Sequence, residues 1–76
     1  MLLNHYVNRA PFRTASVSEC PTTGQITVEL TDGGELLEVS LMGEGLRALT
    51  LARQTAISWA RYGNTDPAHT SPSTIH

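Results

Sequence analysis

Few side chains of this sequence are suited to chemistry, and they are widely spaced. The chain of 76 residues carries one cysteine, Cys20, and three histidines, at positions 5, 69 and 76. A cysteine nucleophile needs a general base and an orienting group close by. Two of the histidines belong to a polar C-terminal segment that is predicted to be disordered, so we expect Cys20 to be a buried or merely tolerated thiol.

Metal and cofactor sites are not indicated either. His69, His76 and Asp66 are metal-ligand residue types, but their spacing fits no compact chelate. A single cysteine excludes an intramolecular disulfide and a cysteine-based zinc site. The Gly-Glu-Gly segment at 43–45 lacks the spacing and the lysine of a phosphate loop, so it is expected only to turn the chain from a strand into a helix. We predict no metal, no cofactor and no small-molecule substrate.

The charged residues also argue against catalysis. All five cations are arginine and lysine is absent, which excludes a phosphate-loop lysine, a Schiff-base lysine and a lysine general base. Glu29, Glu35 and Glu38 alternate along a predicted hairpin, as solvent-facing carboxylates normally do. The chain is therefore predicted not to be an enzyme.

Two runs of alternating apolar residues predict a β-hairpin in residues 25–41. The first run contains Ile26, Val28 and Leu30, and the second contains Leu37, Val39 and Leu41. Alternation of this kind is typical of half-buried strands, so both sets are expected to face one core.

The Asp-Gly-Gly segment at 32–34 offers two turns for this hairpin. A turn at Asp32-Gly33 places Val28 opposite Leu37 and Ile26 opposite Val39, and this register is preferred. A turn one residue later is the alternative, and it sets Glu29 opposite Glu38, a like-charge pair that is mildly destabilising.

A long amphipathic helix is predicted from Glu44 to Tyr62, where good helix formers dominate and no proline occurs. Gly63 is expected to end it, with Arg61 near the negative end of the helix dipole. A broad apolar arc of this helix is expected to lie on the sheet, with Trp59 as its largest buried residue: Leu46, Leu49, Ala52, Ala56, Ile57, Trp59 and Ala60.

The N-terminal third is less regular. Residues 13–20 are partly β-branched and precede a Pro-Thr-Thr-Gly turn, which indicates a third strand joined as a meander. Leu2, Leu3, Tyr6 and Val7 fit one helical turn or a short strand that ends before Pro11. The predicted fold is a small two-layer α+β domain, a two- or three-stranded antiparallel meander packed against one C-terminal helix.

Four residues are candidates for an interface: Leu36, Leu51, Arg53 and Tyr62. Arg53 falls inside the apolar arc of the helix, so it is expected to pair with Glu29 or Glu38 or to anchor a partner. Leu51 and Tyr62 project from the other flank of the helix, and Leu36 from the sheet face opposite the core. This apolar surface exceeds what one helix covers, which favours a homodimer or a protein partner.

The domain organisation supports the same expectation. Residues 1–63 are predicted to form one domain, and residues 64–76 a disordered polar tail. A core this small needs reinforcement, and without disulfide or metal an oligomeric or partner interface supplies it. No secretory signal is recognisable and no run approaches the roughly 20 apolar residues of a membrane helix, so a cytoplasmic location is expected.

These features predict a small non-enzymatic protein-interaction module, an accessory or inhibitory protein of the mobile-element type that binds a partner protein. The alternative is a small nucleic-acid-binding transcriptional regulator with a patch made of Arg9, Arg13, Arg47 and Arg61. The net charge of −2 argues against this alternative.

Overall fold

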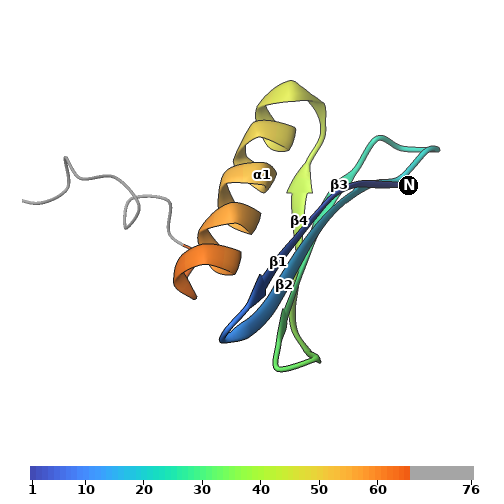
Figure 1. Cartoon of the computed structure of the whole chain (residues 1–76). Coiled ribbons are helices and arrows are strands. Elements are labelled where there is room, and N and C mark those ends of the chain that lie inside the picture. The colour runs from blue at the N-terminus through green and yellow to red at the C-terminus, as the bar shows by residue number, and fades with distance from the viewer. Residues whose placement is uncertain (66–76) are drawn as a thin grey trace, which may run out of the picture.

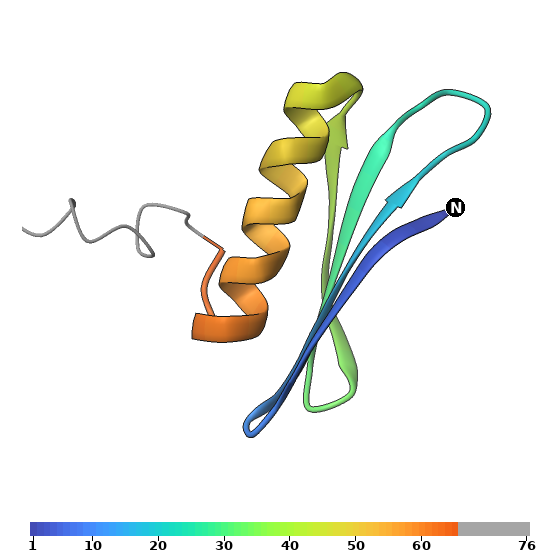
Figure 2. The same ribbon diagram turned by 45° about the horizontal axis from the view of Figure 1, so that its top comes forward.

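Four strands are followed by one helix in the computed structural model, which describes residues 1–65 (Figure 1). The elements are β1 (Leu2–Arg9), β2 (Phe12–Glu19), β3 (Ile26–Asp32), β4 (Glu35–Gly43) and α1 (Gly45–Tyr62). The strands form one antiparallel sheet in the order β1-β2-β3-β4. Helix α1 crosses one face of this sheet (Figures 1 and 2). Most of the predicted tail, with Asp66, His69 and His76, lies outside the described residues.

The strand count is four, so the prediction of two or three strands is wrong although the α+β class is confirmed. The additional strand is β1, which forms a hairpin with β2. Its register shifts between Leu2 and Asn4, so that Leu3 is an extra residue in the ladder. A bulge of this kind breaks the period-2 pattern, and for this reason the sequence of β1 did not distinguish a strand from a helical turn.

The β3–β4 hairpin turns at Gly33-Gly34, where Asp32 pairs with Glu35. Both glycines have positive φ angles, 62° and 91°, as a primed two-residue turn requires. The preferred register is therefore wrong, because Val28 lies opposite Ser40 and Ile26 opposite Gly43.

A bulge in β4 explains why the turn at Gly33-Gly34 does not set Glu29 opposite Glu38, the like-charge pair that the alternative register predicts. The register shifts leave Leu37 and Met42 as extra residues in β4. The bulge at Leu37 places Glu38 across from Leu30 and leaves Val39 across from Glu29. Directly opposed residues share a face of the sheet, so the two glutamates lie on opposite faces.

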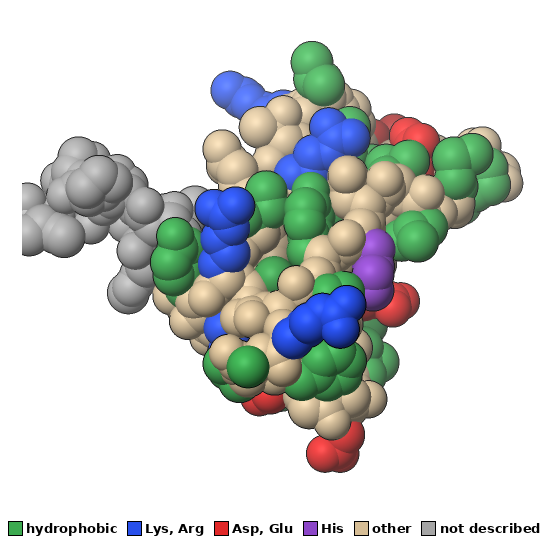
Figure 3. Space-filling view, in the orientation of Figure 1, with side chains coloured by type: hydrophobic (Ala, Val, Ile, Leu, Met, Phe, Trp, Pro, Cys, Tyr) green, Lys and Arg blue, Asp and Glu red, His purple; other side chains and the backbone are tan. Residues whose placement is uncertain are grey.

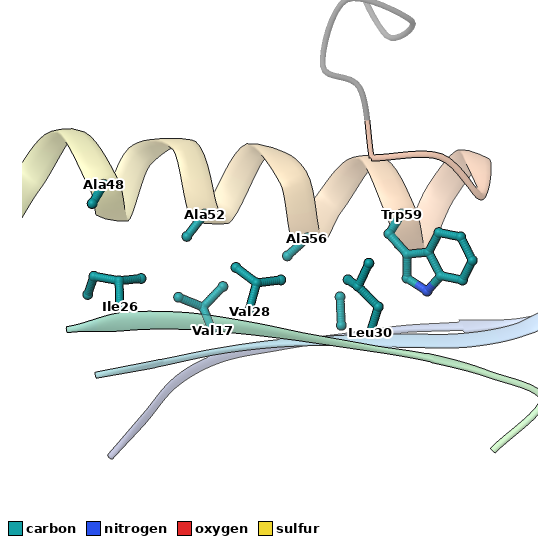
Figure 4. Close-up of a cluster of buried hydrophobic side chains, with 9 residues drawn as sticks. Val17, Ile26, Val28, Leu30, Ala48, Ala52, Ala56 and Trp59 are labelled. Carbon is teal, nitrogen blue, oxygen red and sulfur yellow. The ribbon is translucent and has the colours of Figure 1, made fainter. Parts of the chain in front are cut away.

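The core lies between α1 and the central strands β2 and β3 (Figure 4). Trp59 is 7% exposed, and its indole N–H donates to the carbonyl of Thr31 at 2.9 Å. The predicted burial of Trp59 is confirmed. Alanines at four-residue spacing lie on one face of the helix and bring it close to the sheet. The buried cluster comprises Ala15, Val17, Ile26, Val28, Leu30, Ala48, Ala52, Ala56 and Trp59.

The helix is rotated relative to the predicted orientation. Leu46, which was expected in the core, is 78% exposed, whereas Ala48 is buried at 8%. Ser58, expected on the solvent side, is 1% exposed and its hydroxyl lies 3.3 Å from the side-chain oxygen of Asn64. The rotation centres the alanines on the sheet, since small side chains permit the closest approach.

The C-terminal end of α1 is as predicted, but an arginine from β2 reinforces it. The N–H of Gly63 donates to the carbonyl of Trp59 at 2.9 Å and ends the helix. The guanidinium of Arg13 donates to the carbonyls of Trp59, Ala60 and Arg61 at 3.0, 3.3 and 3.2 Å. A cation at this position satisfies carbonyls that have no partner within the helix and is favoured by the helix dipole.

Candidate functional site

The sheet face opposite α1 has no covering element among the described residues. Residues that lie directly opposite each other on neighbouring strands share a face of the sheet. Ala15, Val17 and Val28 face the helix, so the strand register shows which residues lie on the other face. We call it the open face, and it comprises Leu2, His5, Val7, Arg9, Phe12, Thr14, Ser16, Ser18, Thr27, Glu29, Thr31, Leu36, Val39 and Leu41.

The open face is polar at its centre. The hydroxyls of Thr14 and Thr31 lie 2.6 Å apart, and Nδ1 of His5 lies 2.9 Å from the hydroxyl of Ser16. Glu29, on a central strand, is exposed. The hydroxyls are thus engaged with neighbours across the strands, and Glu29 brings a negative charge to the middle of the face.

The apolar side chains of the open face lie on both sides of its polar centre, with Leu2, Val7 and Phe12 on β1 and β2 and three others on the edge strand β4. Leu36, Val39 and Leu41 are 61%, 48% and 72% exposed, and the bulged Leu37 is 58% exposed. Helix α1 lies mainly over β2 and β3 and reaches β4 least. β4 therefore presents four large aliphatic side chains together with one backbone edge that no other strand of residues 1–65 pairs with.

This arrangement contradicts the prediction that Leu37, Val39 and Leu41 face the core. The alternation along β4 identified a strand correctly, but alternation alone does not say which face is covered. The bulge at Leu37 sets the face by moving Val39 opposite Glu29, on the open face. The side chains that β4 turns toward the helix side are instead Glu38 and Ser40, whose oxygens lie 2.7 Å apart, and Met42, which packs against the core.

The four predicted interface residues are not brought together. Leu36 lies on the open face, as predicted, whereas Leu51, Arg53 and Tyr62 belong to α1 on the other side of the sheet. Leu51 and Tyr62 are exposed by 45% and 57%, but they lie about 16 Å apart along the helix. Of the four, only Leu36 is part of the apolar surface on β4.

Arg53 has a different partner from the one expected. Its Nε donates to the side-chain oxygen of Asn4 in β1 at 2.8 Å. Glu29 lies on the far face of the sheet, so the predicted pair with Glu29 is wrong, as is the alternative with Glu38 on β4. Arg53 instead links the helix to the edge strand β1.

The predicted arginine patch loses one of its four members to the fold. Arg13 is held at the C-terminal carbonyls of α1, and its guanidinium carbon lies 5.8 Å from the centre of the Trp59 ring. This role was missed because nothing in the sequence separates a structural arginine from a surface one. In the space-filling view, arginine side chains occur over the helix side and acidic side chains along the margins (Figure 3).

Cys20 is exposed, so of the two predicted alternatives, a buried or a merely tolerated thiol, the buried one is wrong. It lies at the end of β2, in the turn that leads to β3. Hydrogen bonds from the Thr23 side chain, and then from the backbone at Thr23 and Thr22, lower the pKa of the thiol to about 7. These contacts stabilise the thiolate, but no general base is placed beside it in the described residues.

The alkylation rate of Cys20 by iodoacetamide is expected to rise with pH and to level off above an inflection near 7, because only the thiolate reacts. Thr23→Val removes the largest stabilising contact, so the inflection should move upward and the rate at pH 7 should fall several-fold. Thr22→Val is the matched control, since its side chain contributes least. Mass spectrometry across a pH series measures the alkylation rate and its inflection for each variant. Equal inflections in Thr23→Val and Thr22→Val would contradict the role of the Thr23 side chain in lowering the pKa of Cys20.

The remaining surface features include two hollows, one of which lies between β1 and α1 and is lined by His5, Tyr6, Val7, Ile57, Ala60 and Arg61. A shallow apolar hollow on the outer side of α1 is lined by Leu46, Arg47, Thr50, Leu51 and Gln54. Within residues 1–65, no three His, Cys, Asp or Glu side chains cluster as metal ligands. In the same part of the chain, no helix has the length and apolarity that crossing a bilayer requires.

Comparisons with known proteins add no functional information. No protein-family model, curated protein or solved structure matches this chain. The geometry of β4 and of the open face is therefore the basis for assigning a function.

Proposed function

We propose that this chain is a non-enzymatic protein-interaction module, an accessory or inhibitory protein that binds a protein partner through β4 and the adjoining part of the open face. One observation carries the proposal: β4 is an edge strand of nine residues with four large aliphatic side chains exposed. Isolated exposed leucines are ordinary on protein surfaces, but a row of them along an unpaired strand edge is not.

Edge strands are usually protected against pairing with other chains. Proteins shorten them, place lysine or proline on them, or cover them with a loop or helix. β4 contains no lysine, arginine or proline, and its charged residues are Glu35 and Glu38. Its protection is limited to two bulges, which leave the segment from Glu38 to Leu41 regular. This segment is suited to strand addition, in which main-chain hydrogen bonds supply affinity and alternate side chains supply specificity.

Nucleic-acid binding is less well supported by the same surfaces. Arg13 is engaged at the helix terminus and Arg53 with Asn4. Glu29 sits in the middle of the open face, where a negative charge repels phosphates. A strand-based readout of a DNA groove would require the opposite sign of charge there.

The proposal is tested by comparing two lysine substitutions at leucines of similar exposure. Leu41→Lys changes β4, where Leu41 is 72% exposed, and Leu46→Lys changes the helix, where Leu46 is 78% exposed. The immobilised variants are incubated with lysate of the organism that encodes the chain, and retained proteins are quantified by mass spectrometry. We expect wild type and Leu46→Lys to retain one specific protein, either a different protein or another copy of this chain. The retained amount should be at least tenfold lower with Leu41→Lys. Equal retention by the two variants would contradict a binding role of β4.

A further inference from the structure

We propose that the occupant of β4 is a second copy of this chain, paired antiparallel about a two-fold axis through Val39. Two four-stranded sheets then join into one sheet of eight strands. This inference rests on the proposed function, because it names the partner of the same strand. A two-fold interface requires that one surface be complementary to itself, and the sequence and register of β4 meet this requirement.

The charges and apolar residues of β4 match across an axis at Val39. In this register Leu37 faces Leu41 of the second copy, and Glu38 faces Ser40. Glu35 faces Gly43, so no glutamate meets another glutamate. Each large aliphatic residue of the central segment lies opposite another, a pairing that stabilises antiparallel strands.

The neighbouring registers are less favourable. Opposed residues must share a face, so the axis has to pass through a residue. An axis through Glu38 sets two glutamates directly against each other, which is destabilising. An axis through Ser40 sets Leu37 against Gly43 and leaves that leucine without an apolar partner.

Two other modes of self-association are disfavoured by the structure. Packing two open faces against each other would bury the Glu29 carboxylates near the interface centre, where desolvation of like charges is costly. Pairing through β1 would use a strand whose Asn4 side chain is engaged by Arg53 and whose ladder is interrupted at Leu3. β4 is also interrupted, at Leu37 and Met42, but its segment from Glu38 to Leu41 is regular, and among the described residues no side chain of α1 is hydrogen-bonded to it.

The axis runs perpendicular to the sheet, so the joined sheet carries both helices on one side. The two copies of Val39 and Leu41 then form a continuous apolar patch on the other side, across the junction. This geometry uses the edge of β4 and leaves the outer side of α1 free, so Leu46 remains outside the interface.

Complementary charges at the axis provide the sharpest test. Val39→Lys places two lysines against each other in a homodimer, and Val39→Glu places two glutamates there. Residue 39 also lies across from Glu29 of its own chain, so circular dichroism of each variant first establishes that it is folded. Each variant alone should have a dimer dissociation constant raised about tenfold or more. An equimolar mixture should recover a dimer, since each lysine then meets a glutamate. Recovery also shows that both variants are folded.

Sedimentation velocity of the full chain across a dilution series measures these masses. We expect twice the 8.2 kDa chain mass for wild type and for Leu46→Lys, monomers for each Val39 variant, and a dimer for the mixture of the two Val39 variants. A monomeric wild type throughout the series, variants that dimerise as wild type does, or a mixture that stays monomeric would each overturn it. A monomeric wild type that still retains a partner through Leu41 would overturn the homodimer while leaving the proposed function intact.

Discussion

Trp59→Ala is expected to lower the free energy of unfolding by about 3–5 kcal/mol. The indole is 7% exposed and its N–H donates to the carbonyl of Thr31, so the change leaves a cavity and an unsatisfied acceptor. A domain of this size has a stability on the order of 5 kcal/mol, so the variant should be largely unfolded at room temperature. Urea titration followed by far-UV circular dichroism measures the change, because the variant lacks tryptophan fluorescence.

Trp59→Phe is the matched control for this prediction. It keeps an aromatic ring in the core and removes the hydrogen bond to Thr31, so we expect a loss of about 1–2 kcal/mol. Equal losses for the two variants would show that the hydrogen bond and not the packing dominates. A loss below about 1 kcal/mol for Trp59→Ala would contradict its role as the main core residue.

Arg13→Ala is expected to destabilise the fold by about 2 kcal/mol. The guanidinium donates to three carbonyls at the end of α1 and lies beside the Trp59 ring. Its loss removes the link between β2 and the helix terminus. Arg13→Lys keeps the charge without the planar fork and should lose about half as much.

Arg47→Ala is the control for a helix arginine on the exposed side, and it should change the free energy of unfolding by less than about 0.5 kcal/mol. All variants must be compared at one protein concentration, because self-association makes apparent stability depend on concentration. Equal effects of Arg13→Ala and Arg47→Ala would show that the helix terminus does not depend on Arg13.

The helix and the β3–β4 hairpin were predictable because their signals are local. Composition and the glycine at position 63 located α1 and its end, and alternation located both strands. The same alternation could not assign the apolar residues of β4 to a face, since one extra residue at Leu37 determines the ladder register beyond it. Tertiary contacts, which a short pattern does not contain, decide where such a bulge forms.

The interface prediction was incomplete for the same reason, because the alternation along β4 did not show which face of the sheet its apolar residues occupy. Leu36 was placed correctly on the face opposite the core, but the surface around it, Leu37, Val39 and Leu41, was assigned to the interior. A signal was present in the sequence: the alanine-rich arc of the helix is too narrow to cover apolar residues on every strand. The core is accordingly centred on β2 and β3, and among the described residues β4 adds to it only the partly buried Met42.

The bulge at Leu37 has a consequence for how the gene tolerates changes in length. With Leu37 removed, Leu36 would still lie opposite Thr31 and Glu38 opposite Leu30, so every later residue of β4 would keep its side of the sheet. Deletion of the codon for Leu37 therefore removes the bulge from the edge of β4 without moving any later side chain between the helix side of the sheet and the open face. Elsewhere in a regular strand, loss of one residue reverses all that follow.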